Sequence, residues 1–293
     1  MTRLVQYTLT GLSAGSLYAL VALGIVLIYR STRVLNFAHG DVATFGTFVA
    51  FALIGQGYPY AVAFPAAILA GSALSVLFFF GILVPAQRQG ANLLGQVILT
   101  LGLALVLQGV IVYEWGAEPD RLPFPLSDSR TWKVGPIFLS ELSLGTFGAG
   151  LVGSVLLYLL VQKTRLGLAM RATSENLTAA QTLGIPTRQV LAFAWAVAAA
   201  LGVVGGIFLA AALLLDPFFM LDPFLKGFAA AVLGGLNSLP GAVLGGLLLG
   251  VAESLTGAYL TIQFKNTLAF VVIIVVLLIR PEGLLGREFK ERV

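Results

Sequence analysis

A short polar motif opens one long apolar run of this chain, at Asn36-Phe-Ala-His-Gly-Asp41. Imidazole and carboxylate groups such as His39 and Asp41 carry proton transfer in many proteins. Residues two apart on a helix do not share a face, so this pair is not expected to act as a catalytic dyad. Two interpretations stay open. One is a capped helix start, with Asn36 as N-cap and Asp41 near the positive end of the helix dipole. The other is a direct role in a gate or path.

A second motif, Gly234-Gly-Leu-Asn-Ser-Leu-Pro-Gly241, must break a helix inside another apolar stretch. Irregular backbone at membrane depth is tolerated only where protein buries it or where it lines a cavity. The break is therefore the strongest physical pointer to a functional region. The residues expected to form a substrate path or gate are Asn36, His39, Asp41, Gly234, Gly235 and Asn237.

Three further charges lie in apolar stretches. A charge at the centre of a bilayer costs roughly 2.5–3.5 kcal/mol on insertion scales, so each needs an explanation. For Glu253 a buried hydrogen bond to a neighbouring helix is favoured over ligand binding. Lys226 and Lys265 are expected near the outer interface, with their ammonium groups extended toward water.

Catalytic and metal-binding motifs are missing from the sequence. The chain has no Cys and one His, which cannot form a zinc site alone, so no metal site is expected. There is no Gly-x-Ser-x-Gly or His-Glu-x-x-His motif. No Lys follows a Gly, which excludes a P-loop. We expect a protein that is not an enzyme and binds no cofactor, so any ATPase that powers it is another chain.

The composition is that of a membrane protein. Of 293 residues, 58% are hydrophobic and only 10% are charged, against about 25% in soluble domains. A ninth apolar run, 224–237, is too short to cross about 30 Å at 1.5 Å per residue and predicts a re-entrant or broken span. The fold expected is an all-α polytopic protein with one domain over residues 1–293. Its eight long runs are 4–29, 36–55, 60–84, 93–113, 142–162, 189–215, 240–259 and 265–280.

Basic residues are distributed unevenly among the connectors, which predicts the orientation. They follow the first, third, fifth and last long runs, whereas residues 114–141 and 215–223 are net acidic. The N-terminus and the loop 114–141 are therefore expected outside, with Trp115 and Trp132 at the headgroup level, and the C-terminus in the cytoplasm. That arrangement needs nine crossings. Nothing in the net charge of +4 suggests nucleic acid.

The connector 163–190 is the long, net-basic interruption of the apolar sequence. It predicts a short helix over Glu175–Leu183, capped by Ser174 and ended by Gly184 and Pro186. Small side chains at Ala179 and Ala180 would let another protein approach this helix closely. Elsewhere, four Gly-xxx-Gly pairs predict close helix packing, at Gly11/Gly15, Gly202/Gly206, Gly241/Gly245 and Gly246/Gly250.

Four stretches in order resemble the LivH-type permease subunits of branched-chain amino-acid ABC importers. They are Gly11–Gly24, Val34–Asp41, Arg171–Arg188 and Lys226–Gly250, and they span most of the chain. The resemblance implies an importer permease fold in the bacterial inner membrane. It also implies half of a heterodimeric pore with a second, LivM-type permease, two cytoplasmic ATPases that bind ATP and Mg, and a periplasmic binding protein. The residues that it assigns to ATPase coupling are Arg171, Glu175, Ala179, Ala180, Leu183 and Gly184.

Branched-chain amino acids are the expected substrates, and related permeases that move amides, urea or aromatic acids leave other small solutes open. An ion-coupled secondary transporter is a rival class. It would need a buried carboxylate coupled to flux, for which Asp41 and Glu253 are the candidates. An intramembrane enzyme would need the pair His39 and Asp41, whose spacing argues against it.

Overall fold

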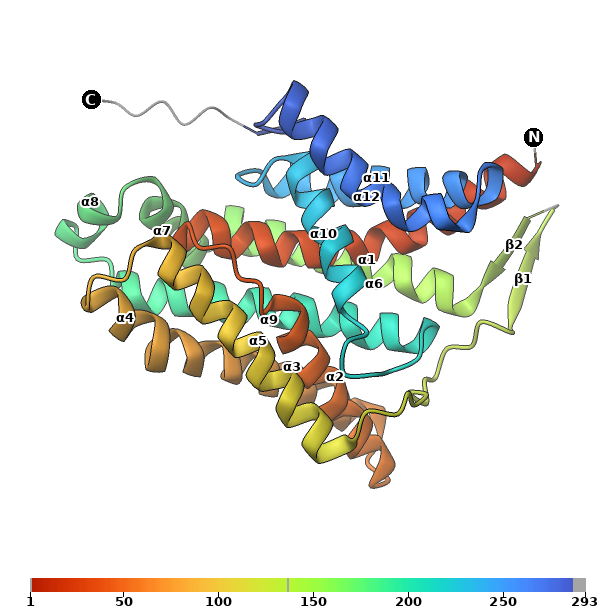
Figure 1. Ribbon diagram of the computed structural model, residues 1–293, viewed down its shortest axis with the longest axis horizontal. Coiled ribbons are helices and arrows are strands. Elements are labelled where there is room, and N and C mark those ends of the chain that lie inside the picture. The colour runs from red at the N-terminus through yellow and green to blue at the C-terminus, as the bar shows by residue number, and fades with distance from the viewer. Residues whose placement is uncertain (1, 136, 287–293) are drawn as a thin grey trace. The chain divides into compact units, whose positions relative to one another are not determined.

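The computed structural model describes residues 2–135 and 137–286, and most of them are helical (Figure 1). Each of the nine apolar runs predicted from the sequence corresponds to a helix. The helices are α1 Thr2–Thr32, α2 His39–Gly55, α3 Tyr60–Phe78, the π-helical turn η1 Phe79–Leu83, α4 Val84–Arg88, α5 Leu93–Trp115, α6 Glu141–Lys163, α7 Arg165–Glu175, α8 Leu177–Thr182, α9 Thr187–Ala212, α10 Leu221–Gly234, α11 Leu239–Tyr259 and α12 Ile262–Ile279.

Six helices in the described part of the chain are long and apolar enough to cross a membrane. They are Arg3–Thr32, Tyr60–Arg88, Leu93–Trp115, Glu141–Lys163, Thr187–Ala212 and Leu239–Tyr259. Two shorter apolar helices, His39–Gly55 and Thr267–Ile279, account for the other two long runs. The expected total of eight long spans therefore stays a prediction. The basic tail residues Arg287, Lys290 and Arg292 lie outside the described residues.

Strands were not expected, and a small hairpin corrects the all-α prediction. Strand β1 (Thr131–Val134) pairs antiparallel with β2 (Ile137–Ser140), with Thr131 opposite Ser140. The side-chain amide of Gln6, on α1, donates to the carbonyl of Phe138 at 2.7 Å and accepts from its N–H at 2.9 Å. The hairpin at the end of the loop 114–141 is thus hydrogen-bonded to α1 through Gln6.

The residues of the chain cluster into two compact units, which we describe separately. The first contains residues 1–26, 126–154 and 224–293, and the second contains 27–125 and 155–223. Helices α1 and α6 contribute to both. The expectation of one permease domain over 1–293 stays a prediction.

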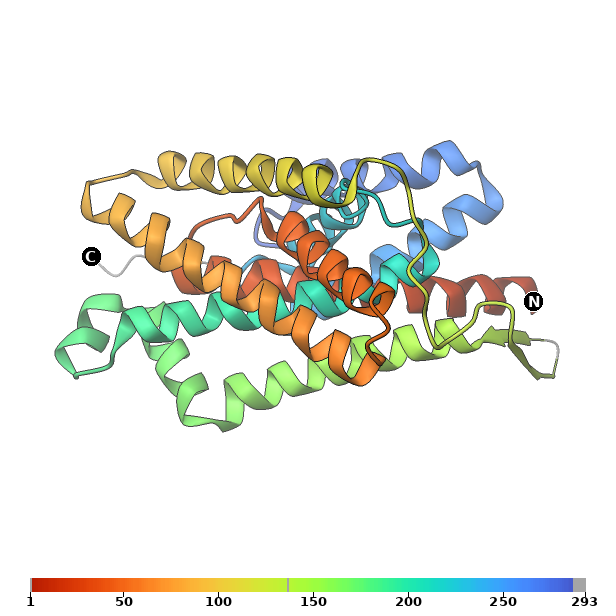
Figure 2. The same ribbon diagram turned by 90° about the horizontal axis from the view of Figure 1, so that it is seen from below.

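Helices α2, α3 and α9 pack together in the second unit and lie side by side in Figures 1 and 2. Val203 of α9 fills the space that glycines leave on both neighbours. A Cβ added at Gly46 or at Gly71 would lie only 2.5 or 2.6 Å from a Val203 methyl group. Hydroxyl groups add polar ties, since Ser75 donates to the carbonyl of the fully buried Trp195 at 3.2 Å. This close packing fixes α9 against both α2 and α3.

The end of the third run is not a regular α-helix. Residues Phe79–Leu83 form a π-helical turn directly before α4, whose second residue is Pro85. Proline has no N–H and its ring clashes with the carbonyl four residues earlier, so the regular α-helical bond cannot form there. The extra residue in the turn lets the helix continue to Arg88 as α4.

Glycines bring α1, α10 and α11 into backbone contact in the first unit. A Cβ on Gly15 of α1 would lie 2.7 Å from the carbonyl oxygen of Gly246 on α11. On the other side of α11, a Cβ on Gly245 would strike the carbonyl of Ala230 on α10. All four Gly-xxx-Gly pairs predicted from the sequence lie at such helix contacts, which confirms their packing role.

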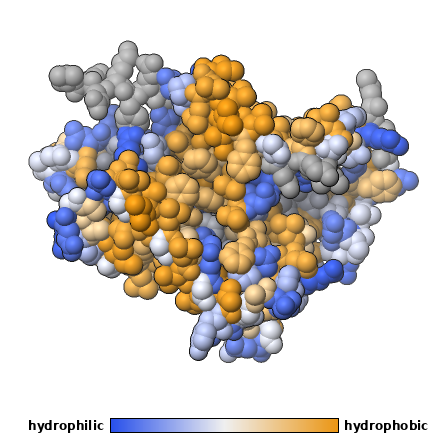
Figure 3. All heavy atoms as spheres, in the orientation of Figure 1, coloured by the Kyte–Doolittle hydropathy of each residue, from blue (hydrophilic) through white to orange (hydrophobic). Residues whose placement is uncertain are grey.

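Large apolar side chains remain exposed along several helices, and they colour much of the face in Figure 3 orange. Helices surrounded by lipid have this surface, because the bilayer core offers no water to satisfy polar groups. Examples are Leu105 and Val106 on α5, Leu151 and Leu156 on α6, and Ile274 and Leu278 on α12.

Candidate functional site

The first candidate site residues lie where α2 begins, in the second unit. Helix α2 starts at His39, and its N-cap position is Ala38, without a side-chain cap. The expectation that Asn36 caps this helix is therefore wrong. Its side-chain oxygen instead accepts a hydrogen bond from the Ala38 N–H at 3.1 Å, and its carbonyl accepts from the His39 N–H at 3.3 Å. Asn36 thus forms a turn that leads into the helix.

His39 and Asp41 face different neighbours. The His39 side chain is 1% exposed and its ring lies against Gly202 of α9, where a Cβ would come within 3.1 Å of it. Asp41 is in the first turn of α2, as expected, and its carboxylate accepts a hydrogen bond from the Gln108 amide of α5 at 2.8 Å. The two side chains form no dyad, which agrees with their spacing. Their role in a gate stays a prediction.

The polar connector forms two helices instead of one. Helix α7 ends at Glu175, and the six-residue α8 follows with Asn176 as its N-cap, whose side chain accepts from the Ala179 N–H at 2.9 Å. Ser174 does not cap it as predicted, because its hydroxyl donates to the Met170 carbonyl at 2.6 Å inside α7. Gly184 ends the segment with φ +78°, a left-handed conformation that glycine adopts without strain.

The predicted coupling residues of this connector differ in how far they are buried. Glu175, Ala179, Leu183 and Gly184 are exposed, and Leu183 is 81% exposed. Ala180 is 2% exposed and packs within the chain, so it does not offer the open face that was expected of it. Arg171 is half-buried and donates to the Gln162 side chain at 2.9 Å, which ties α7 to α6. The predicted coupling residues that are open at the surface are therefore Glu175, Ala179, Leu183 and Gly184.

The helix break is covered by protein. Gly235 follows α10 with φ +108°, and Ser238 caps α11 by accepting from the Gly241 N–H at 3.1 Å. The carbonyls freed at Leu233 and Gly234 accept from the N–H groups of Leu284 and Leu285, at 2.8 and 3.0 Å. The segment after α12 thus supplies the hydrogen-bond donors that the carbonyls at the break need, and it approaches Gly235 closely. A path role for Gly234, Gly235 and Asn237 stays a prediction.

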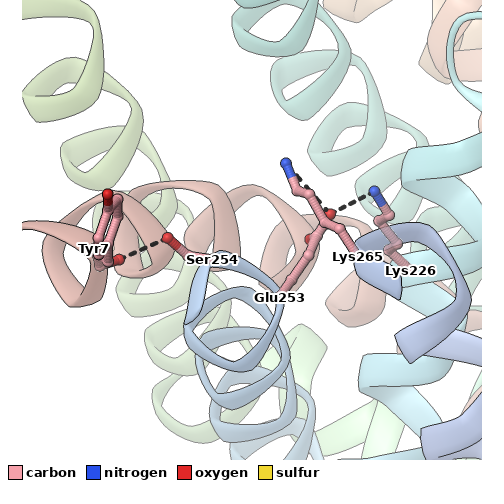
Figure 4. Close-up of polar contacts among 5 residues, drawn as sticks. All are labelled: Tyr7, Lys226, Glu253, Ser254 and Lys265. Carbon is pink, nitrogen blue, oxygen red and sulfur yellow. Dashed lines mark hydrogen bonds and ion pairs between the residues drawn. The ribbon is translucent and has the colours of Figure 1, made fainter. Parts of the chain in front are cut away.

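The sequence alone did not predict that Lys226, Glu253 and Lys265 lie together as a charge cluster. Lys226 of α10 lies 2.6 Å from the Glu253 carboxylate of α11, and Lys265 of α12 lies 3.7 Å from the same oxygen (Figure 4). Lys226 is 5% exposed, so the prediction that it reaches toward water is wrong. The buried hydrogen bond predicted for Glu253 is confirmed. The signal for this pairing was two opposite charges within adjacent apolar runs.

The sequence also carried a signal for one further polar contact, between Gln108 and Asp41. Gln108 lies within the apolar run 93–113, where a side-chain amide needs a partner. Its partner is Asp41, 67 residues earlier in the sequence. Among residues 2–135 and 137–286, no group of three or more His, Asp or Glu side chains could hold a metal ion.

These features define a polytopic helical membrane protein with an exposed polar connector between two of its long helices. Residues 7–278 match the family model described as branched-chain amino acid transport system / permease component. The chain belongs to this family.

The chain is similar to named members of that family. It is 33% identical to the high-affinity branched-chain amino acid transport system permease protein LivH of Escherichia coli K12, over 98% of this chain and 97% of LivH. It is 34% identical to the corresponding BraD protein of Pseudomonas aeruginosa, over the same shares. The fold resembles a chain of PsaBC from Streptococcus pneumoniae, solved with a Fab, with TM-score 0.53 and 13% identity over 94% of this chain and 91% of that one.

Proposed function

We propose that this chain is a permease subunit of an ATP-driven importer for leucine, isoleucine and valine. One observation carries the proposal: the family match covers residues 7–278, and relatives named for this transport align over nearly the whole chain. The chain would form half of a heterodimeric pore with a LivM-type permease. Two cytoplasmic ATPases would hydrolyse ATP with Mg, and a periplasmic binding protein would deliver the amino acid.

The chemistry of the chain suits such a division of labour. A free amino acid carries a carboxylate and an ammonium group, and helix ends can receive both through free N–H and C=O groups without ionised side chains. A separate binding protein supplies specificity, so the permease needs no tight site. The sequence lacks catalytic motifs, which agrees with ATP hydrolysis by another chain.

Uptake by the reconstituted complex tests the proposal. The chain is co-purified with the second permease and the ATPases that its neighbouring genes encode, and the complex is placed in vesicles with the binding protein. Radiolabelled leucine should accumulate only with ATP on the ATPase side, and excess isoleucine or valine should compete. Vesicles without ATP are the control. ATP-dependent uptake of urea, an amide or an aromatic acid, without leucine uptake, would assign the chain to another small solute.

The proposed orientation has nine crossings, with the short α10 as one of them and the N-terminus outside. The chain lacks cysteine, so single cysteines report the side of the membrane. Ser127→Cys in the loop 114–141 should react with an impermeant thiol reagent in intact cells, and Thr178→Cys on α8 should react only after lysis. Both positions are polar and lie outside the candidate spans. The reverse labelling pattern would overturn the orientation.

A further inference from the structure

Helices α10 and α11 form a hairpin whose contacts run from one end to the other. At the closed end, a Cβ on Gly234 would strike the carbonyl of Gly241. One turn further along, a Cβ on Gly245 would strike the carbonyl of Ala230. At the open end, the ammonium group of Lys226 reaches the Glu253 carboxylate at 2.6 Å (Figure 4). This ion pair, the clasp, adds a polar contact to a hairpin whose helices also meet through their backbones.

The clasp lies in apolar surroundings that also hold α1. The side chains of Lys226 and Glu253 are 6% and 3% exposed. The Tyr18 ring of α1 lies 5.7 Å from the Lys226 ammonium, within the range of a cation–π interaction. A Cβ on Gly227, the next residue of α10, would come within 2.5 Å of a Val21 methyl group. Three helices therefore meet around a pair of opposite charges.

Stability alone does not account for such a pair. Taking two charges out of water costs several kcal/mol for each ion, and exchange of a buried ion pair for apolar side chains of similar volume is often neutral or stabilising. Loss of one partner is strongly destabilising because it leaves an uncompensated charge. A directional contact between two long side chains does fix which residues face each other, a role that polar residues play in helix pairing.

We propose that Lys226 and Glu253 are positioning residues for transport, which hold α10 and the turn Gly235–Ser238 in place against α11. This inference rests on the proposed import function. Helix α10 has 14 residues and spans about 21 Å at 1.5 Å per residue, short of the roughly 30 Å hydrocarbon core. Its depth and rotation therefore depend on its neighbours, and the ion pair fixes both. The candidate path residue Asn237 lies in the turn that the clasp positions.

Lys265 gives the carboxylate a second cation. It lies 3.7 Å from the Glu253 oxygen that Lys226 contacts, and its side chain is 44% exposed. Because it is more exposed and more distant, it contributes less than Lys226 does. Lys265→Met is accordingly expected to lower uptake two- to fivefold, a smaller loss than the paired replacement described next.

The test separates position from stability. The paired variant Lys226→Met with Glu253→Leu removes both charges at similar volume, and the swap Lys226→Glu with Glu253→Lys restores an ion pair in reverse. Lys133→Met, an exposed lysine of β1, is the matched control. Each is made with Leu236→Cys, a half-buried reporter in the turn of a chain that has no other cysteine. The readouts are the melting temperature of the complex, the rate of thiol labelling at residue 236, and leucine uptake.

The apolar pair should melt within a few degrees of wild type, label at least threefold faster or slower, and lose at least tenfold in uptake. The swap should return the labelling rate to within twofold and recover part of the uptake. Wild-type labelling and uptake in a folded apolar pair would overturn the proposal. If the apolar pair does not fold, the swap decides. A folded swap with wild-type labelling supports positioning, and a swap that is unfolded or labels abnormally overturns it.

The labelling arm needs no substrate, so it distinguishes this inference from the proposed function. Altered labelling in the apolar pair, together with no leucine uptake by the wild-type complex, would refute the substrate and leave the positioning role standing. Normal leucine uptake by the wild type, together with unchanged labelling and uptake in the apolar pair, would support the substrate and refute the positioning role.

Discussion

Leu183→Asp is expected to abolish ATP-dependent uptake while the permease remains folded in the membrane. Leu183 is 81% exposed at the end of α8, so the change removes no packing within the chain. An apolar residue at the centre of a protein interface is worth about 2–4 kcal/mol, and an ionised carboxylate buried in its place adds a desolvation cost. A loss of that size weakens ATPase binding roughly 30- to 1,000-fold. Co-purification with the ATPases and uptake in vesicles measure the effect.

Two companion variants make the result specific. Gln89→Asp adds the same charge at an exposed position after α4, on the same side of the membrane in the proposed orientation, and should leave uptake within twofold. Gly184→Leu should act like Leu183→Asp, because φ +78° is strained for leucine and the end of α8 must move. Ala180→Arg would not separate coupling from folding, because Ala180 is buried and the change would disrupt α8 itself. Normal ATPase binding by Leu183→Asp would remove α8 from the coupling surface.

Positions of helices were predictable from the sequence because long apolar runs in this chain have one stable solution. Backbone groups in a bilayer must be satisfied internally, so each run forms a helix. The glycine pairs were predictable for a similar reason, since a side chain at Gly15 or Gly246 would prevent the close approach that such spacing indicates. Both arguments need only neighbours along the sequence.

Exact helix ends and contacts between distant residues were not predictable in the same way. Ser174 and Asn176 are both good N-caps, and the choice between them follows from how far α7 extends before α8 begins. Trp115 packs on Phe48 with ring centroids 5.4 Å apart, a contact between residues 67 positions apart that the sequence did not indicate, and its place at the headgroup level stays a prediction. Lys226 was placed near water because its partner Glu253 is 27 residues away on another helix. The assigned path and coupling residues themselves stay predictions.

Gly246→Leu is expected to prevent the protein from accumulating in the membrane. A Cβ at this position of α11 would lie 2.5 Å from the backbone nitrogen of Ala19 and 2.6 Å from its Cα, both on α1. Backbone cannot rotate away as a side chain can, so α1 and α11 must separate. Overpacking of a tight core costs about 1–3 kcal/mol and occasionally more, and here it acts along a seam that also includes Gly11, Gly15 and Gly250.

Gly109→Leu on α5 is the matched control for this seam. Gly109 is an exposed glycine in an apolar helix, and a Cβ there would meet nothing within 4 Å. Both variants make the same chemical change in a candidate span, so only the packing differs. Membrane levels from immunoblots and the melting temperature of purified protein should fall sharply for Gly246→Leu and stay near wild type for Gly109→Leu. Normal levels and melting of Gly246→Leu would mean that α1 and α11 do not share this glycine seam, and the contacts that place Tyr18 beside the Lys226–Glu253 pair would lose their support.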